Sequence, residues 1–387
     1  MTGGEGSREN QTGKAEGRNY GIDLLRIVCM YLICVLHVCG QGGAMTRYTG
    51  RDASWYAVYI LETAGYCAVN TYGMISGYVG IASRRRPARI VELWLRVLWY
   101  SGLGTLAGIF LFHLPAEKDT LWKAIFPTMW KTYWYFSAYA GVFVIAPYLD
   151  RMVKALTDGQ KKKLMITLFL LCSVFTMVPR ASTTGSDFLG LAAGYSFLWL
   201  AVMYVIGACV RMLSDANDKF LNRSGLFYAI LYAACVFVTW ISKILIENHT
   251  KSVYGEARYG RLLFSYTGPT IVICAFALLM IFSRIRVKGG AAKGIIRFLS
   301  PLAFSVYLVQ VQPYFWNYWL KGRYVFIAQN GPVSACVLVL IFSAVLYLLC
   351  TAVDLIRMLV FRIVPVRKIS EKVTGYALKV FDRFDKE

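Results

Sequence analysis

Charged side chains are scarce in this sequence. Only 16% of its 387 residues are Asp, Glu, Lys or Arg, whereas 57% are hydrophobic. A soluble domain of this length carries more charge and cannot bury so much apolar surface in one core. The scarcity of charge excludes an ordinary soluble enzyme and indicates that a lipid bilayer is the solvent.

Metal-site and disulfide patterns are also missing. The ten cysteines form no Cys-x-x-Cys motif and no Cys/His spacing typical of a metal site, so no bound metal is expected. Cys39 and Cys67 lie nearer the outer ends of two apolar runs, and a disulfide between these two remains an alternative. The other eight fall inside apolar runs, where a thiol behaves as a small hydrophobic group: Cys29, Cys34, Cys172, Cys209, Cys235, Cys274, Cys336 and Cys350.

The apolar residues are gathered in ten runs, each of the order of the 20 residues or so that a helix needs to cross a bilayer. The ninth run contains Pro301 and Pro313, with polar Gln310 and Gln312 near its centre, so we expect it to be kinked or partly re-entrant. The sequence therefore predicts an all-α, polytopic membrane bundle of about ten transmembrane helices. The runs are 21–39, 56–82, 90–113, 132–149, 164–180, 190–210, 226–246, 262–282, 296–319 and 332–360.

The formal net charge of +21 could suggest a nucleic-acid partner, but the basic residues lie in short connectors and do not pattern one soluble face. Twenty-eight lysines and arginines fall in alternate connectors and in the two tails, and 11 fall in the opposite connectors. By the positive-inside rule this alternation predicts an even number of spans with both termini in the cytoplasm. We expect a multi-pass protein of the bacterial inner membrane.

The two tails differ from the region between them. Residues 1–18 are rich in Gly, Glu, Asn and Ser, which predicts a disordered cytoplasmic tail, and the apolar run that follows has no signal-peptide cleavage site. Residues 19–362 form the expected transmembrane domain. Residues 363–387 form a basic tail, in which 369–384 has the period of an amphipathic helix on the inner leaflet.

The first run carries ionisable residues that are costly inside a membrane, among them Arg26 and His37. The two are eleven residues apart, close to three helical turns, so both side chains project to one side of the helix about 16 Å apart along its axis. Imidazole suits proton transfer near neutral pH. Two simpler explanations are that His37 only bonds a neighbouring helix and that Arg26 only reaches the interface.

Several segments in order along the chain resemble the acyltransferase-3 family, membrane proteins that O-acylate cell-surface glycans. The first helix of that family has an Arg, ten residues and then a His, the spacing of Arg26 and His37. The resemblance implies an acyl-CoA donor, expected to be acetyl-CoA, on the cytoplasmic side and a glycan acceptor outside. The other similar segments are Cys67 to Gly80 (CAVNTYGMISGYVG), RRRPARI from Arg84, Tyr133 to Asp150, Gly194 to Arg211 and Ser300 to Pro313.

The implied mechanism is direct transfer. His37 acts as the general base on the acceptor hydroxyl, which attacks the thioester, while Arg26 and other inner arginines hold the donor; an acyl-histidine intermediate is a second possibility. One departure matters, because many relatives have a histidine where this chain has Gln310. Glutamine cannot shuttle a proton, so His37 acts alone if that histidine is catalytic, and Gln310 substitutes if it only positions substrate.

Arginines near the start of the third run are the expected contacts for the phosphates of coenzyme A, because guanidinium binds phosphate in a bidentate manner. They are Arg84, Arg85, Arg86, Arg89 and Arg96. Anchoring to anionic lipid explains any of the first four equally well. An ion pair with Glu92, one turn earlier, is the alternative for Arg96.

Further candidates lie in other spans, and one of them, Glu62, enters the second span at a depth similar to that of His37. Glu62 could orient the imidazole, as the acid does in a hydrolase triad. Substrate contacts are expected from Asn70, Ser76, Tyr78, Tyr135, Tyr139 and Gln310. Packing between helices, or an interfacial aromatic belt, explains most of these almost as well.

Two other functions fit parts of the pattern. Broken spans with buried charges also suit a transporter or flippase. A sensing or uptake domain would need a fused soluble catalytic domain, which we do not expect here, so any chemistry is expected in the membrane part. The sequence does not fix the oligomeric state.

Overall fold

The computed structural model describes residues 18–45, 52–180 and 187–381, and in these ranges the chain forms helices and no strand. The predicted all-α class is therefore confirmed. Almost all of the predicted tail 1–18 and the last six residues lie outside the described ranges. The α-helices are α1 (Tyr20–Cys39), α2 (Ala53–Gly65), α3 (Ala68–Gly80), α4 (Ala88–Leu106), α5 (Thr120–Ile125), α6 (Trp134–Ala155), α7 (Asp158–Phe169), α8 (Met177–Arg180), α9 (Phe197–Asp215), α10 (Gly225–Tyr254), α11 (Pro269–Ser283), α12 (Gly290–Leu299), α13 (Ala303–Gln310), α14 (Pro332–Ile363) and α15 (Val366–Phe381).

Within the described residues, seven helical segments are long and apolar enough to cross a membrane. They are Tyr20–Cys39, Ala88–Leu111, Asp158–Pro179, Phe197–Asp215, Gly225–Tyr254, Gly290–Gln310 and Pro332–Ile363. A shorter apolar helix, α11, accompanies them. The count of ten spans and the cytoplasmic position of both termini stay predictions.

Polar side chains set the starts of several apolar helices. The Asn19 side chain accepts a hydrogen bond from the backbone N–H of Ile22 (3.2 Å) at the start of α1, and Ser196 and Ser224 cap α9 and α10 in the same way. Each cap satisfies a backbone donor that the first helical turn leaves without a partner. The apolar runs are therefore bounded by local hydrogen bonding as well as by hydropathy.

Two predicted spans are broken in the structure. The run 56–82 consists of two helices, α2 and α3, which meet at a turn at Tyr66 and Cys67. The run 296–319 consists of α12, a 3-10 turn (Ser300–Leu302), α13 and a π-helical turn (Phe315–Leu320). The predicted kink in this ninth run is confirmed, because α13 ends at Gln310, before Pro313.

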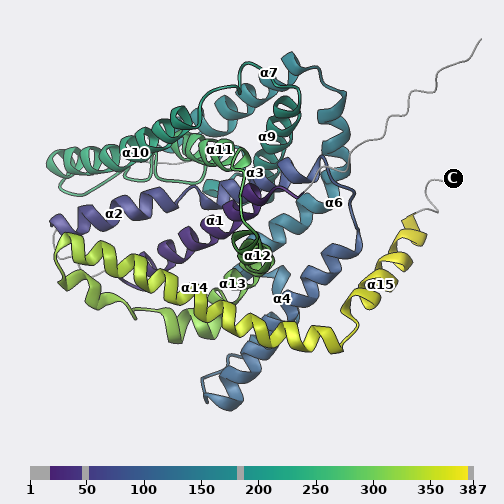
Figure 1. Ribbon diagram of the computed structural model, residues 1–387. Coiled ribbons are helices and arrows are strands. Elements are labelled where there is room, and N and C mark those ends of the chain that lie inside the picture. Colours follow the sequence, from purple (N-terminus) through teal and green to yellow (C-terminus); the bar gives the residue numbers. More distant parts are fainter. Residues whose placement is uncertain (1–17, 46–51, 181–186, 382–387) are drawn as a thin grey trace, which may run out of the picture.

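Helix α1 lies in the middle of the bundle, with α10 and α11 on one side and α14 on the other (Figure 1). Helices α3 and α9 approach backbone to backbone at two glycines, Gly77 of α3 and Gly207 of α9. A Cβ atom at Gly77 would lie 1.8 Å from the Tyr204 carbonyl oxygen, and one at Gly207 would lie 2.0 Å from the Met74 carbonyl oxygen. Small residues of this kind let membrane helices approach closely.

Helix α15 follows α14 and lies toward the edge of the molecule (Figure 1). It contacts the start of α4 through Glu371, which pairs with Arg367 of its own helix (2.9 Å) and lies 3.9 Å from Arg86. The Arg367 guanidinium lowers the pKa of the Glu371 carboxyl. The helix predicted for 369–384 is confirmed up to Phe381, while its position on a membrane stays a prediction.

Candidate active site

His37 lies near the end of α1 and contacts α13. Its Nδ1 atom is 2.8 Å from Oε1 of Gln310, a residue 273 positions away in the sequence. The Trp316 ring meets the imidazole edge-on, with 4.9 Å between ring centroids and an interplanar angle of 87°. Two residues that were predicted separately, His37 and Gln310, are thus direct neighbours.

The hydrogen bonds of Gln310 fix the protonation pattern of the imidazole. Its Nε2 donates to the Val306 carbonyl (3.2 Å) and to Sγ of Cys34 (3.2 Å), so Oε1 faces His37. A carbonyl oxygen can only accept, so Nδ1 of His37 carries the hydrogen. In the neutral imidazole, Nε2 of His37 is then the unprotonated acceptor that a general base requires.

His37 lines a cavity of about 840 Å³ between α1, α2, α3, α6, α10, α13 and the loop before α11. The volume lies within the usual range for small-molecule sites. Aromatic rings form much of the wall, and several touch one another: Tyr66 stacks on Tyr266 at 4.7 Å, and Trp134 lies 4.7 Å from Tyr195. The cavity is therefore an apolar chamber with a few polar groups.

Glu62 lines the same cavity, on α2. The orienting contact that the sequence suggested for it is made by Gln310, since no hydrogen bond joins Glu62 to His37 among the described residues. The charges nearest to Glu62 are basic and come from Lys243 and Arg261, which also line the cavity. Glu62 thus belongs to an ionic group on the cavity wall.

Tyr135 and Asn70 are the predicted substrate residues closest to this cavity. Tyr135 lines it directly. Asn70 is fully buried and supports the wall, because its Nδ2 donates to the Tyr266 carbonyl (2.7 Å) and its Oδ1 accepts from Nε1 of Trp199 (2.9 Å). Asn70 therefore holds the position of Tyr266, which does line the cavity.

Three other predicted substrate residues do not line this cavity. Ser76 donates to the Tyr72 carbonyl one turn earlier in α3 (2.9 Å), and Tyr139 packs beside Phe143. Tyr78 lies at the opposite end of α3, under the Arg211 guanidinium, and lines a second cavity of about 530 Å³. The structure thus separates Tyr78 from His37.

The second cavity is polar and lined by three arginines. Arg211 pairs with Asp215 (2.8 Å), and Arg284 donates to two backbone carbonyls of the loop after α9. Asp218 in that loop is held by Lys162 at 3.0 Å, and this ammonium lowers the pKa of the Asp218 carboxyl. The third arginine, Arg286, enters no ion pair within the described residues.

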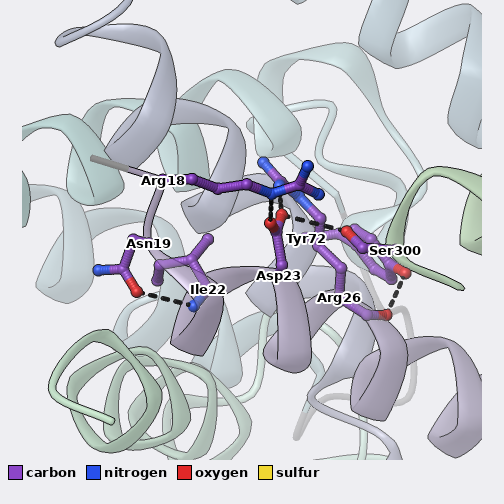
Figure 2. Close-up of polar contacts among 7 residues, drawn as sticks. All are labelled: Arg18, Asn19, Ile22, Asp23, Arg26, Tyr72 and Ser300. Carbon is purple, nitrogen blue, oxygen red and sulfur yellow. Dashed lines mark hydrogen bonds and ion pairs between the residues drawn. The ribbon is translucent and has the colours of Figure 1, made fainter. Parts of the chain in front are cut away.

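Arg26 lies at the other end of α1 from His37, in the cluster shown in Figure 2. Its Nη1 is 2.6 Å from Oδ1 of Asp23, which also accepts from Ser300 (3.1 Å) and from Arg18. Asp23 is almost fully buried, and no role was predicted for it. The cluster holds two guanidinium groups on one carboxylate, which leaves a net positive charge.

A direct contact connects this cluster to the cavity of His37. The Tyr72 hydroxyl donates to the Arg26 carbonyl at 2.6 Å (Figure 2). The Tyr72 side chain also lines the cavity. Met30, one turn after Arg26 on α1, lines the cavity as well. Arg26 therefore lies just beneath the cavity floor.

The arginines at the start of α4 have different surroundings. Arg85, in the connector before α4, forms a partly buried ion pair with Asp150 of α6 (2.5 Å) and contacts the Tyr204 hydroxyl of α9, so it joins this connector to two helices. Arg86 pairs with Glu92 at 2.6 Å. Arg84 and Arg89 are exposed and have no ion-pair partner among the described residues.

The suggested Glu92–Arg96 ion pair is wrong, because Glu92 is bound by Arg86. Arg96 instead points toward α13, where its Nη1 lies 3.4 Å from the Pro301 carbonyl and 3.5 Å from the Ser305 hydroxyl. Its buried Nε has no hydrogen-bond partner within the described part of the chain.

Sequence reasoning missed several residues of the site. Tyr307 lines the cavity one turn before Gln310, and its buried hydroxyl makes no hydrogen bond within the described residues. Trp316, Lys243 and Arg261 were also not singled out. Lys243 could have been found from the sequence, because a basic residue inside an apolar run, here 226–246, indicates a functional position.

All ten cysteines are free, including Cys39 and Cys67. Among the residues that the structure describes, no group of three or more His, Cys, Asp or Glu side chains could hold a metal ion. The chemistry available at the cavity is that of an oriented imidazole, a buried tyrosine hydroxyl in the wall and several charged groups.

Comparison with known proteins found no significant match among curated proteins or solved structures. A family model described as an acyltransferase domain does match, over residues 19–352. The match covers α1 to most of α14 and includes every residue placed above at the cavity of His37. The chain therefore belongs to the acyltransferase-3 family.

Proposed function

We propose that this protein is a membrane O-acyltransferase that moves an acyl group, expected to be acetyl, from acyl-CoA to a hydroxyl of a cell-surface glycan. One observation carries the proposal: His37 lies on the wall of a cavity with Nδ1 bound to Gln310, which leaves Nε2 free to accept a proton. We place the protein in the bacterial inner membrane, with the cavity open to the outside.

In the proposed reaction, Nε2 of His37 takes the proton of the acceptor hydroxyl, and the oxygen attacks the thioester carbonyl carbon. The C–S bond then breaks, and the CoA sulfur leaves with the proton from the imidazolium. The Tyr307 hydroxyl is the proposed donor to the carbonyl oxygen as negative charge develops there, since it is buried, lines the cavity and has no partner of its own.

The donor is proposed to enter from the side of Arg26. Arg18 and Arg26 share one carboxylate, so their guanidinium groups retain capacity for a phosphate. The proximity of Arg26 to the cavity floor at Tyr72 would bring the thioester toward His37. Arg84 and Arg89, which are exposed, are proposed to bind coenzyme A further from the cavity, on the cytoplasmic side. Arg85 is not, because Asp150 already binds it.

The test is the O-acyl content of envelope polysaccharide, measured by mass spectrometry in cells that carry His37→Gln. Glutamine can still donate to Gln310 but cannot accept a proton as imidazole does, so we expect acyl transfer to fall by about 10²–10⁴-fold. His249→Ala, at an exposed histidine of α10 outside the cavity, is the matched control. Wild-type acylation in the His37 variant would refute an acyltransferase role and leave a transporter as the better explanation.

A further inference from the structure

The cavity of His37 has an excess of basic groups. Three basic side chains line it: Lys131 before α6, Lys243 of α10 and Arg261 in the loop before α11. Glu62 is the one carboxylate among the described lining residues. The excess is unexpected on the outer side of a membrane protein, where lysine and arginine are depleted.

These basic groups differ in how far they are neutralised. Lys243 lies 3.7 Å from Glu247 and over the rings of Tyr59 and Phe264, at 5.0 and 4.9 Å. Lys131 and Arg261, in contrast, enter no ion pair within the described residues, and both are exposed. After Glu62 and Glu247 are counted against the three cations, the cavity retains one net positive charge.

The same cavity has the aromatic wall formed by Tyr66, Trp134, Tyr195 and Tyr266. Flat rings suit the C–H faces of a sugar, while guanidinium and ammonium groups bind carboxylate or phosphate with charge-assisted hydrogen bonds. A neutral glycan would use the rings and leave the charges of Lys131 and Arg261 without a partner.

We propose that the acceptor is an anionic sugar, whose carboxylate or phosphate is bound by Arg261 and Lys131 while one of its hydroxyls lies at His37. This inference rests on the proposed function for the hydroxyl at His37. The anion-binding part is independent of catalysis and can be measured without acyl transfer.

The experiment measures binding of three matched sugars to the purified full-length protein in detergent by isothermal titration calorimetry. Methyl glucoside, methyl glucuronide and methyl glucoside 6-phosphate differ only at the sixth carbon, and they separate a neutral group, a carboxylate and a phosphate. We expect the preferred charged sugar to bind at least about tenfold more tightly than the neutral one, because hydrogen bonds to charged groups are stronger. The preference should shrink at high salt.

Variants assign the preference to the cavity. Arg261→Gln combined with Lys131→Gln should remove most of the tenfold preference while binding of methyl glucoside stays unchanged. Arg258→Gln is the matched control, because Arg258 lies in the same loop but pairs with Glu256 (2.7 Å) and does not line the cavity. Equal affinities for the three sugars, no measurable binding of the charged ones, or a preference that survives the double substitution would overturn the inference.

The proposed function and this inference can fail separately. Acyl transfer from acetyl-CoA is assayed with the same preparations and with His37→Gln. Charge-selective binding without any acyl transfer would refute the acyltransferase function and support the anion-binding site. Acyl transfer with no preference for charge would support the acyltransferase function and refute the anionic acceptor.

Discussion

Gln310 provides the sharpest test of how His37 works. If its role is to hold Nδ1–H of the imidazole, an isosteric side chain without an acceptor should impair catalysis. Gln310→Met keeps the length of the side chain and removes the hydrogen bond of 2.8 Å to His37. Gln310→His places an acceptor nitrogen on the side chain at the same position.

The expected fall in kcat follows from the hydrogen bond between His37 and Gln310 that is lost. A neutral hydrogen bond contributes about 0.5–1.5 kcal/mol, and about 1.4 kcal/mol corresponds to tenfold in rate. We therefore expect kcat of Gln310→Met to fall about tenfold with little change in KM, because the ring is still present but no longer held in the productive tautomer. Gln310→His should recover most of the loss.

The assay follows release of the CoA thiol from acetyl-CoA by protein in proteoliposomes, with envelope glycan from cells that lack the protein as acceptor. Thermal unfolding of each variant is measured in parallel, since Gln310 is completely buried. Wild-type kcat in Gln310→Met, or equal loss in the Met and His variants at equal stability, would refute the positioning role.

Three further predictions test the packing and the arginines. Gly77→Leu should lower the melting temperature, because a Cβ atom there meets the Tyr204 carbonyl and overpacking typically costs about 1–3 kcal/mol; Gly102→Leu, which faces open space, should not. Asp150→Ala should destabilise the fold by about 1–3 kcal/mol, because it leaves the partly buried guanidinium of Arg85 without its counter-ion. Thermal unfolding followed by circular dichroism measures this loss, and an unchanged melting temperature would contradict the prediction. Arg26→Ala should keep stability, since Asp23 remains paired with Arg18, while the KM for acetyl-CoA rises about tenfold or more; an unchanged KM would assign Arg26 a purely structural role.

Hydropathy was sufficient to predict the class of the fold. The apolar runs that contain α1, α10 and α14 stand out because each is long and bounded by polar or basic residues. The break between α2 and α3 was not predicted, because both halves are apolar and Gly65, the last residue of α2, is a single glycine of a kind that is common inside membrane helices. Whether a helix breaks at such a residue depends on how it packs against other helices.

The candidate site was predicted in its parts but not in its contacts. Arg26 and His37 lie on one helix, so helical geometry was enough to place them. The bond between His37 and Gln310 joins residues 273 positions apart, and the approach of Lys243 and Arg261 to Glu62 depends on how α10 packs. Spacing along one helix carries no information on such lateral neighbours.

The neutral partner of His37 has a consequence for the proposed mechanism. In a hydrolase triad a carboxylate holds the imidazole and also stabilises its charged form. Gln310 can perform only the first of these tasks, and it does so without placing a costly charge inside the bundle. The imidazolium formed during transfer would then have no counter-charge within hydrogen-bonding distance on its Nδ1 side. A short-lived imidazolium, which passes its proton to the leaving sulfur as the C–S bond breaks, fits this environment better than an accumulated charged or acylated histidine.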